Sequence, residues 1–377
     1  MSAILPGETI GILGGGQLGR MLCLEARRMG YRTLVWSGTE VAEPTMGVAD
    51  EVLCRSFDDQ EALARFVDEV AVATVEFENI SGSLLEEVEA KVGLYPPAKA
   101  VLIAQNRRAE KLFLRDAGVA CAPFYLITNE KELAAGMADF LEGAVLKTAA
   151  FGYDGKGQVK LSAGMDLGKV WKEFEAEEAM LEKWIPFEKE LSVMVARGGD
   201  GEMVCYDVAE NVHRSHILDT STVPAMLPEA VQEEAQAMAR KIAEALDYRG
   251  ILGVEFFYGP EMGLLVNEMA PRPHNSGHHT MDACRTSQFE QQLRAVTGLR
   301  LGSAELMSEV TMLNLLGDLW RGSEEDLWEV LAKEPEMTWH VYGKSEVRGM
   351  RKCGHANFLG KDSLARAREV KRRLGVE

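Results

Sequence analysis

Short apolar runs alternate with helical patterns over the first hundred residues. An apolar run at Thr9–Leu13 precedes three glycines, and apolar residues from Leu18 to Met29 then recur every three or four positions up to Gly30. This spacing predicts a strand, a glycine turn and an amphipathic helix that stops at Gly30.

The alternation continues as far as Pro96-Pro97. Further strands are predicted at Thr33–Trp36, around Val52-Leu53 and at Val72–Phe77, with helices over Asp59–Val70 and Leu84–Val92. Strands that alternate with helices form a parallel sheet covered by those helices. We therefore expect an α/β protein in which residues 1–105 form a Rossmann-like domain.

Two further regions follow the proline pair. A helix over Arg107–Ala117, a strand at Ala144–Lys147 and the glycine-rich stretch Phe151–Gln158 predict a small domain over residues 106–188. Residues 189–377 are expected to form a larger α+β domain. Its predicted strands are Glu190–Val195, Met203–Val208 and Gly253–Tyr258, and its predicted helix has an apolar stripe of Val231, Ala235, Met238, Ile242 and Leu246.

Charge and composition narrow the function classes. The 377 residues carry 41 Lys and Arg against 59 Asp and Glu, a net charge of −18. This charge disfavours nucleic-acid and anionic-membrane binding, so an anionic ligand needs a local basic pocket. No apolar run approaches the roughly 20 residues of a membrane helix, which favours a cytoplasmic protein. Six scattered cysteines without a CxxC pair indicate ordinary reduced thiols.

The glycine turn Gly14–Gly19 leaves two interpretations open. Free N–H groups at a helix N-terminus attract an anion, but the same glycines also allow a helix and a strand to pack closely. A dinucleotide site would need an acidic residue at the end of the second strand, where the sequence is Leu34-Val35-Trp36-Ser37-Gly38. Hydride transfer is therefore disfavoured.

The second glycine-rich stretch, Phe151–Gln158, could fold its backbone N–H groups over phosphates. It is not a Walker loop, because Gly157 and not Ser or Thr follows Lys156. A surface hairpin is the alternative.

Two late glutamates predict a cation site. The turn Gly259–Gly263 separates two apolar strands, and pairing Tyr258 with Leu265 would place Glu255 opposite Glu268. Opposed like charges destabilise a sheet unless a cation lies between them, and Asn267 offers another oxygen. Magnesium bound to nucleotide phosphates is the natural candidate, and a solvated face is the alternative.

Together these motifs resemble the ATP-grasp superfamily. Within it, five segments resemble the 5-(carboxyamino)imidazole ribonucleotide synthase family, over residues from about 10 to 360. They are Gly14–Met21, Glu76–Ile80, Phe151–Gln158, Asn267–His278 and Arg351–His355, of which Arg272-Pro273-His274-Asn275-Ser276-Gly277-His278 is the most specific. The resemblance implies an ATP-grasp fold, with a preATP-grasp domain, a small lid and a larger C-terminal domain.

The resemblance also implies an ATP site. Arg107 and Lys147 would meet phosphates, and Gly152 to Gln158 would close over them. Glu190 would bind the ribose hydroxyls, while Glu255 and Glu268 would hold Mg²⁺. The implied ATP-binding residues are Arg107, Lys147, Gly152, Tyr153, Asp154, Gly155, Lys156, Gly157, Gln158, Glu182, Lys183, Trp184, Ile185, Glu190, His213, Asn267 and Glu268. Among them, Glu182 to Ile185 would present the adenine edge.

The chemistry that the family implies begins with bicarbonate and ATP, which give carboxyphosphate and ADP. The carboxyl group is then delivered to the exocyclic amine of 5-aminoimidazole ribonucleotide, a step of purine biosynthesis. Arg272 and His274 would orient the anions, with Lys352 and Tyr153 nearby. His274 could instead be a structural turn residue, or a zinc ligand with His278 and His279.

The ribonucleotide phosphate needs a basic segment. The segment from Lys344 to His355 has a local excess of three positive charges. It contains four basic residues, Lys344, Arg348, Arg351 and Lys352, and one acidic residue, Glu346. Lys344 and Arg351 would bind the phosphate, although an exposed loop with incidental charges is the alternative. The full set implied for this substrate is Gln17, Leu18, Glu76, Asp154, Arg272, Lys344 and Arg351.

Two rival functions remain at this level. A formate-dependent glycinamide ribonucleotide formyltransferase would share the ATP site, and an ATP sensor would bind nucleotide without turnover. The resemblance further implies a homodimer whose product passes to a carboxyaminoimidazole ribonucleotide mutase.

Overall fold

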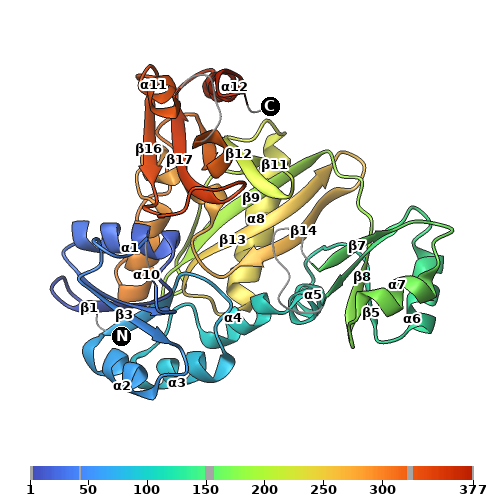
Figure 1. Cartoon of the computed structure of the whole chain (residues 1–377), viewed down its shortest axis with the longest axis horizontal. Coiled ribbons are helices and arrows are strands. Elements are labelled where there is room, and N and C mark those ends of the chain that lie inside the picture. Colours follow the sequence, from blue (N-terminus) through green and yellow to red (C-terminus); the bar gives the residue numbers. More distant parts are fainter. Residues whose placement is uncertain (1–2, 42–43, 149–156, 321–325, 376–377) are drawn as a thin grey trace.

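Three β-sheets organise the chain in the computed structural model, which describes residues 3–41, 44–148, 157–320 and 326–375. Figure 1 shows the N-terminal sheet at the lower left, the smallest unit projecting at the right and the large C-terminal sheet between and above them. None of the described helices is both long and apolar enough to cross a bilayer.

The N-terminal sheet confirms the expected parallel α/β arrangement. Its strand order is β3-β2-β1-β4, and every pairing is parallel. Separate hydrophobic clusters lie on its two faces, one with α2 and α3 and the other with α1. Its elements are β1 (Thr9–Leu13), α1 (Gln17–Arg28), β2 (Arg32–Gly38), β3 (Glu51–Ser56), α2 (Gln60–Glu69), β4 (Val72–Val75) and α3 (Gly82–Val92).

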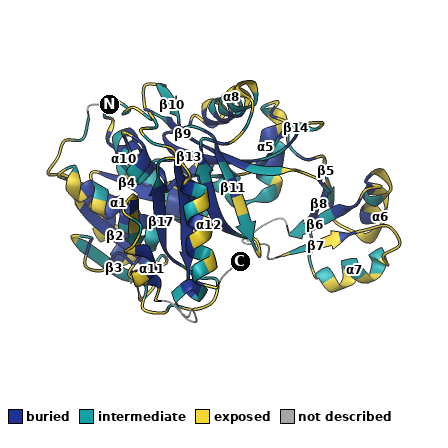
Figure 2. Ribbon diagram, turned by 90° about the horizontal axis from the view of Figure 1, so that it is seen from above, coloured by how far each residue is buried: buried dark blue, intermediate teal, exposed yellow. Residues whose placement is uncertain are grey.

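Two helices, α4 (Ala98–Gln105) and α5 (Arg107–Asp116), lead from this sheet into the small unit. There an antiparallel sheet of order β5-β8-β6-β7 packs against two helices around a small core. The elements are β5 (Phe124–Ile127), α6 (Glu130–Asp139), β6 (Ala144–Thr148), β7 (Gln158–Leu161), α7 (Leu167–Phe174) and β8 (Ala179–Lys183). Much of the outer surface of α6 and α7 is exposed (Figure 2).

The C-terminal sheet has nine strands in the order β14-β13-β9-β11-β12-β15-β17-β16, with β10 paired to β9. The strands are β9 (Lys189–Arg197), β10 (Met203–Cys205), β11 (Ala209–Arg214), β12 (Ile217–Val223), β13 (Gly250–Gly259), β14 (Gly263–Ala270), β15 (Val310–Leu316), β16 (Met337–Val341) and β17 (Lys352–Leu359). The helices are α8 (Glu229–Ala245), η1 (Asn275–Gly277), α9 (Thr280–Ala283), α10 (Gln288–Thr297), η2 (Gly317–Trp320), α11 (Leu327–Leu331) and α12 (Ser363–Arg373).

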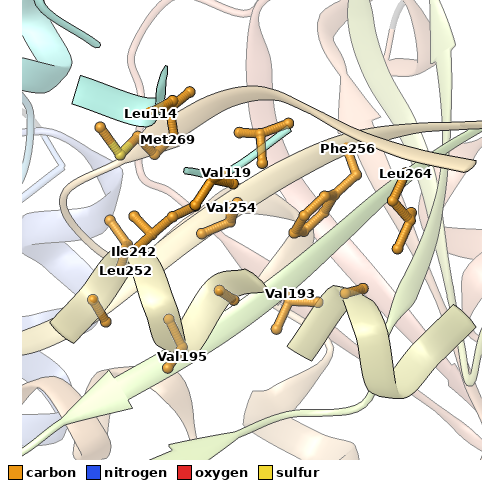
Figure 3. Close-up of a cluster of buried hydrophobic side chains, with 14 of the residues drawn as sticks. Leu114, Val119, Val193, Val195, Ile242, Leu252, Val254, Phe256, Leu264 and Met269 are labelled. Atoms are coloured by element: carbon orange, nitrogen blue, oxygen red, sulfur yellow. The ribbon is translucent and has the colours of Figure 1, made fainter. Parts of the chain in front are cut away.

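One face of this sheet is apolar, and the other carries charged and polar residues of the candidate site. Val193, Val254 and Phe256 pack with Ile242 of the predicted helix α8 and with Leu114 of α5 (Figure 3). Successive strand residues point to opposite faces, so the residues between them lie on the other face. These residues are Glu190, Ser192 and Glu255, and this face is where the site forms.

The hairpin register differs from the predicted one at its turn. Tyr258 pairs with Leu264 and not with Leu265, yet Glu255 still stands opposite Glu268. A β-bulge accounts for both observations, because Asn267 is an extra residue between the Phe256–Val266 and Glu255–Glu268 pairs. The predicted pairing of the two glutamates is therefore correct, although the register from which it was derived is wrong.

Candidate active site

Glu255 and Glu268 form the centre of the site. Burial and the negative charge of Glu268 raise the pKa of Glu255 to about 8, while His213 and Lys352 oppose the shift. The pair therefore favours binding a proton or a cation. Carboxylates at a bulge, with the Asn267 amide adjacent in sequence, form a donor set suited to Mg²⁺.

Helix α5 braces the strand that carries Glu268. The Lys111 side chain is 2% exposed, and its ammonium donates to the Asn267 carbonyl at 2.8 Å. Glu110 accepts a 2.7 Å hydrogen bond from the Met269 N–H, so the two side chains hold the backbone on either side of Glu268. Sequence reasoning missed both residues. The available signal was a pair of charged residues that shares the buried helix face of Leu114.

Lys147 and Glu182 lie together as an ion pair. Lys147 Nζ is 3.0 Å from Glu182 Oε2, and Lys111 Nζ is 3.8 Å from the same oxygen. These cations hold the pKa of Glu182 below its ordinary value although burial opposes the shift. Of the other residues expected at the adenine edge, Lys183 pairs with Glu142 at 3.3 Å, Trp184 lies against Lys160, and Ile185 is buried.

The second glycine-rich stretch joins β6 to β7, and only its C-terminal end is described. Thr148 N–H donates to the Gly157 carbonyl at 2.9 Å, and Gln158 pairs with Lys147. Arg107 donates to the Thr148 carbonyl at 3.2 Å, so it stands where the loop leaves the sheet. The predicted residues Gly152, Tyr153, Asp154, Gly155 and Lys156 lie outside the described residues.

Glu190 and His213 are paired on the same sheet face. His213 Nδ1 lies 2.7 Å from Glu190 Oε2, and both side chains are partly exposed. The Glu190 carboxylate raises the pKa of His213 even though burial acts in the opposite direction. The pair lies close enough to Glu255 to influence its pKa.

Arg272 and His274 stand beside the carboxylate pair. Arg272 is held by two hydrogen bonds to Glu78, of 2.6 and 3.1 Å, and sequence reasoning gave Glu78 no role. His274 Nε2 lies 3.6 Å from Glu255 Oε1. Burial, together with Arg272 and Lys352, lowers the pKa of His274 well below its ordinary value, so its imidazole is neutral at pH 7.

The other two histidines of the motif have different partners. His278 Nδ1 bonds Gln288 at 3.0 Å, and His279 Nδ1 bonds the Ser276 carbonyl at 2.9 Å. Both rings are buried. This arrangement assigns them to the packing of η1 against α10 and does not support the zinc alternative.

The first glycine turn binds a carboxyl group supplied by the chain itself. Glu76 accepts from the Gly16 N–H at 2.6 Å and from the Gly19 N–H at 2.9 Å. A Cβ on Gly16 would lie 2.4 Å from a Glu76 oxygen, which explains the glycine. The open N-terminus expected for a ligand is therefore occupied by Glu76. The Leu18 side chain packs in the core, so only its backbone can meet a substrate.

The basic segment faces this turn from the C-terminal domain. Lys344 Nζ donates to Gln17 Oε1 and to the Lys352 carbonyl, each at 2.6 Å. Burial and the neighbouring Arg351 and Lys352 lower the pKa of Lys344 to about 8. Arg351 donates to the Glu346 carbonyl at 3.0 Å and is 34% exposed. The structure thus brings predicted ribonucleotide residues from two domains together.

Electrostatic contacts link these groups into one array. Glu76 interacts with Arg272 and Lys344, and Arg272 also interacts with Glu268. Lys352 influences Glu255, His274 and Lys344 alike. Several described residues of the predicted ATP, anion and ribonucleotide sites therefore lie close enough to influence one another's charge.

Comparison with known protein families matches three stretches of the chain. Residues 7–105 match the ribonucleotide synthetase preATP-grasp domain, residues 112–289 the ATP-grasp domain, and residues 310–369 the phosphoribosylaminoimidazole carboxylase C-terminal domain.

Curated relatives are similar along nearly their whole length. N5-carboxyaminoimidazole ribonucleotide synthase of Brucella melitensis is 43% identical, with 95% of this chain and 98% of that protein covered. The enzyme of the same name from Bacillus subtilis is 40% identical, with 94% and 92% covered.

Solved structures agree with this relationship. An ADP complex of N5-carboxyaminoimidazole ribonucleotide synthetase is 41% identical, with a TM-score of 0.92 over 99% of this chain and 97% of that chain. The synthase of Aspergillus clavatus, in complex with ADP and 5-aminoimidazole ribonucleotide, is 29% identical, with a TM-score of 0.85 over 97% of each chain. This protein belongs to the N5-carboxyaminoimidazole ribonucleotide synthase family of ATP-grasp ligases.

Proposed function

We propose that the protein uses ATP and bicarbonate to carboxylate the exocyclic amine of 5-aminoimidazole ribonucleotide. The observation that carries the proposal is that Arg272 and His274 lie near two other groups of residues. One group is the opposed carboxylates Glu255 and Glu268, and the other is the basic segment, whose Lys352 interacts with His274.

ATP is proposed to lie between the small unit and the C-terminal sheet. Lys147 and Arg107 stand at the base of the β6–β7 loop, where they can meet phosphates as fixed charges. Glu182 Oε1 is buried without a partner among the described residues, and the adenine amino group is a donor of the type that it lacks. The Glu190–His213 pair is available to the ribose hydroxyls.

Glu255 and Glu268 fit Mg²⁺ because two opposed carboxylates, one with a raised pKa, are stabilised by a divalent cation. When bound, Mg²⁺ supplies charge neutralisation for the phosphate oxygens of ATP. Lys111 and Glu110 hold the backbone of β14, so the backbone that carries Glu268 is fixed before any ligand arrives. Such positioning is the chief need of phosphoryl transfer.

The bicarbonate step is assigned to the anion pocket. A bicarbonate oxygen attacks the γ-phosphorus and ADP leaves, which gives carboxyphosphate. The amine of the ribonucleotide then takes the carboxyl group and loses a proton, while inorganic phosphate departs. Arg272 is oriented by Glu78, and its planar guanidinium suits a flat anion. His274 is a neutral hydrogen-bonding group beside it.

The ribonucleotide phosphate is proposed to bind Lys344 and Arg351, with Gln17 alongside. Glu76 is proposed to act mainly on the protein itself, because it fixes the N-terminus of α1 on which Gln17 stands. By the family relationship, the proposal extends to a cytoplasmic homodimer whose product goes to the corresponding mutase.

The decisive assay is ADP release with each substrate omitted in turn. Release that needs both bicarbonate and 5-aminoimidazole ribonucleotide supports the synthase. Release that needs formate and glycinamide ribonucleotide would establish the formyltransferase, and tight ATP binding without release would establish a sensor.

A further inference from the structure

A chain of buried polar side chains leads away from His274 into the sheet. His274 Nδ1 lies 2.9 Å from Ser276 Oγ, which accepts from Ser192 Oγ at 2.8 Å. Ser192 in turn accepts from Asn211 Nδ2 at 2.9 Å, and Ser221 Oγ donates to Asn211 Oδ1 at 2.7 Å. The chain thus crosses from η1 through β9 and β11 to β12.

These residues are polar where a packed sheet would ordinarily be apolar. Ser192, Asn211, Ser221 and Ser276 are each at most 4% exposed. Burying a hydroxyl or an amide is unfavourable unless it is hydrogen-bonded, and apolar residues would fill the same space without that requirement. This series of hydrogen-bonded side chains therefore needs an explanation beyond packing.

One fixed donor determines which atoms donate and which accept in the hydrogen bonds between His274 and Ser276. The backbone N–H of Ser276 points at His274 Nδ1 at 3.4 Å, and a backbone N–H can only donate. Nδ1 is therefore an acceptor. The Ser276 hydroxyl, which accepts from Ser192, has its single hydrogen left for the same nitrogen. With Nδ1 unprotonated, a neutral imidazole must carry its hydrogen on Nε2.

The ring is fixed at its backbone as well. Gln288 accepts from the His274 N–H at 2.9 Å and donates to the His274 carbonyl at 2.8 Å. Gly253 of β13 leaves the necessary space, since a Cβ there would lie 2.9 Å from His274 Cβ. Nε2 consequently points toward Glu255, at 3.6 Å from Oε1.

We propose that Ser276, Ser192 and Asn211 are positioning residues that hold His274 as the Nε2–H tautomer, with this N–H directed at the anion that binds beside Glu255. This inference rests on the proposed function for the identity of the anion. It makes His274 a fixed hydrogen-bond donor to bicarbonate and carboxyphosphate, and not the base that removes the amine proton.

The tautomer can be measured without turnover. In the ¹⁵N-histidine protein, two-bond ¹H–¹⁵N correlation spectra distinguish Nδ1–H from Nε2–H rings, and the His274→Asn variant identifies the His274 signals. We expect an Nε2–H pattern in the wild-type protein. Ser276→Ala keeps the longer 3.4 Å contact from the backbone N–H but loses the 2.9 Å contact from the hydroxyl, so we expect a mixed pattern in that variant. An Nδ1–H pattern in the wild-type protein would overturn the inference.

Kinetics then test the link to the reaction. Ser276→Ala and Ser192→Ala should each lower kcat for bicarbonate-dependent carboxylation by about tenfold, with little change in the KM of ATP. Thr222→Val is the matched control, because it removes a hydroxyl bonded to Thr311 on the opposite face of the same sheet. Equal losses in all three variants, or normal kcat in both serine variants, would overturn the positioning role.

Failure of the proposed function has a separate signature. Absence of bicarbonate-dependent product in the wild-type protein would overturn the reaction, whatever the tautomer. A carboxylating enzyme whose His274 is Nδ1–H would overturn this inference alone.

Discussion

Glu255 and Glu268 stand directly opposite one another on β13 and β14, and the repulsion between their carboxylates contributes to a pKa of about 8 for Glu255. The folded protein therefore holds this proton more tightly than the unfolded chain does. Between the ordinary value of 4.5 and about 8, the folded state binds more protons, so the apo protein should lose stability as the pH rises through this window.

The Glu268→Gln substitution should abolish ADP release and stabilise the apo protein. Loss of the repulsion should raise the melting temperature by about 1–3 °C at pH 7–8 and remove stabilisation by Mg²⁺-nucleotide. Glu261→Gln, an exposed position at the turn of the same hairpin, is the control and should change neither property. An active Glu268→Gln enzyme at ordinary Mg²⁺ concentration would exclude the metal assignment.

Lys111→Met should impair ATP use although Lys111 is proposed to position the site rather than to bind ATP. The substitution leaves the Asn267 carbonyl without its donor and removes one of two cations from Glu182. We expect the KM of ATP to rise at least tenfold, because about 1.4 kcal/mol or more of positioning is lost. The control for the loss of a lysine is Lys91→Met, because the Lys91 side chain is exposed and its ammonium pairs with Glu87. An unchanged KM of ATP in Lys111→Met would show that the contact between Lys111 and the Asn267 carbonyl is not needed for ATP use.

Lys344 should make ribonucleotide use sensitive to alkaline pH. Its pKa of about 8 means that the free enzyme loses this positive charge as the pH rises through 8, and a phosphate ligand favours the protonated form. Hence kcat/KM for the ribonucleotide should fall above pH 8, whereas kcat/KM for ATP should not show this loss. Lys344→Arg should flatten the profile, because arginine stays charged.

Alanine at Lys344 or Arg351 should raise the ribonucleotide KM by roughly thirtyfold, about 2 kcal/mol, and leave that of ATP nearly unchanged. Arg348→Ala is the control from the same segment, since its side chain is 75% exposed. An equal effect on ATP would place the segment in the nucleotide site.

Periodicity predicted the strands and helices of the N-terminal sheet because each buries a continuous apolar stripe. It did not indicate β5, β8, α6 or α7, which belong to a small, partly exposed unit. The buried residues of α6 are only Leu133 and Gly136, and α7 has none, so neither helix buries a continuous apolar stripe. The bulge at Asn267 was equally hidden. A register counted from a turn cannot show an extra residue that is stabilised by Lys111, which lies far away in the sequence.

The site residues also divide into those that the sequence could predict and those that it could not. Polar and charged residues in compact motifs, such as Arg272, His274 and Lys344, could be predicted as site residues from their neighbours in the sequence. Ser192, Asn211 and Ser221 were not, because single polar residues in strands resemble a solvated face. Only the strand order β9-β11-β12 brings them together. Glu76 was predicted as a substrate contact, but its hydrogen bonds to the Gly16 and Gly19 N–H groups follow from the close approach of β4 to the α1 turn.

The most direct test follows the carboxyl carbon. With ATP, Mg²⁺, 5-aminoimidazole ribonucleotide and ¹⁴C-bicarbonate, label should enter the product in step with ADP formation, persist at mildly alkaline pH and leave as gas on acidification, because carbamates lose CO2 in acid. His274→Asn should retain ATP binding and lose this incorporation by roughly a hundredfold. Absence of label, together with incorporation of formate into an acid-stable product, would contradict carboxylation.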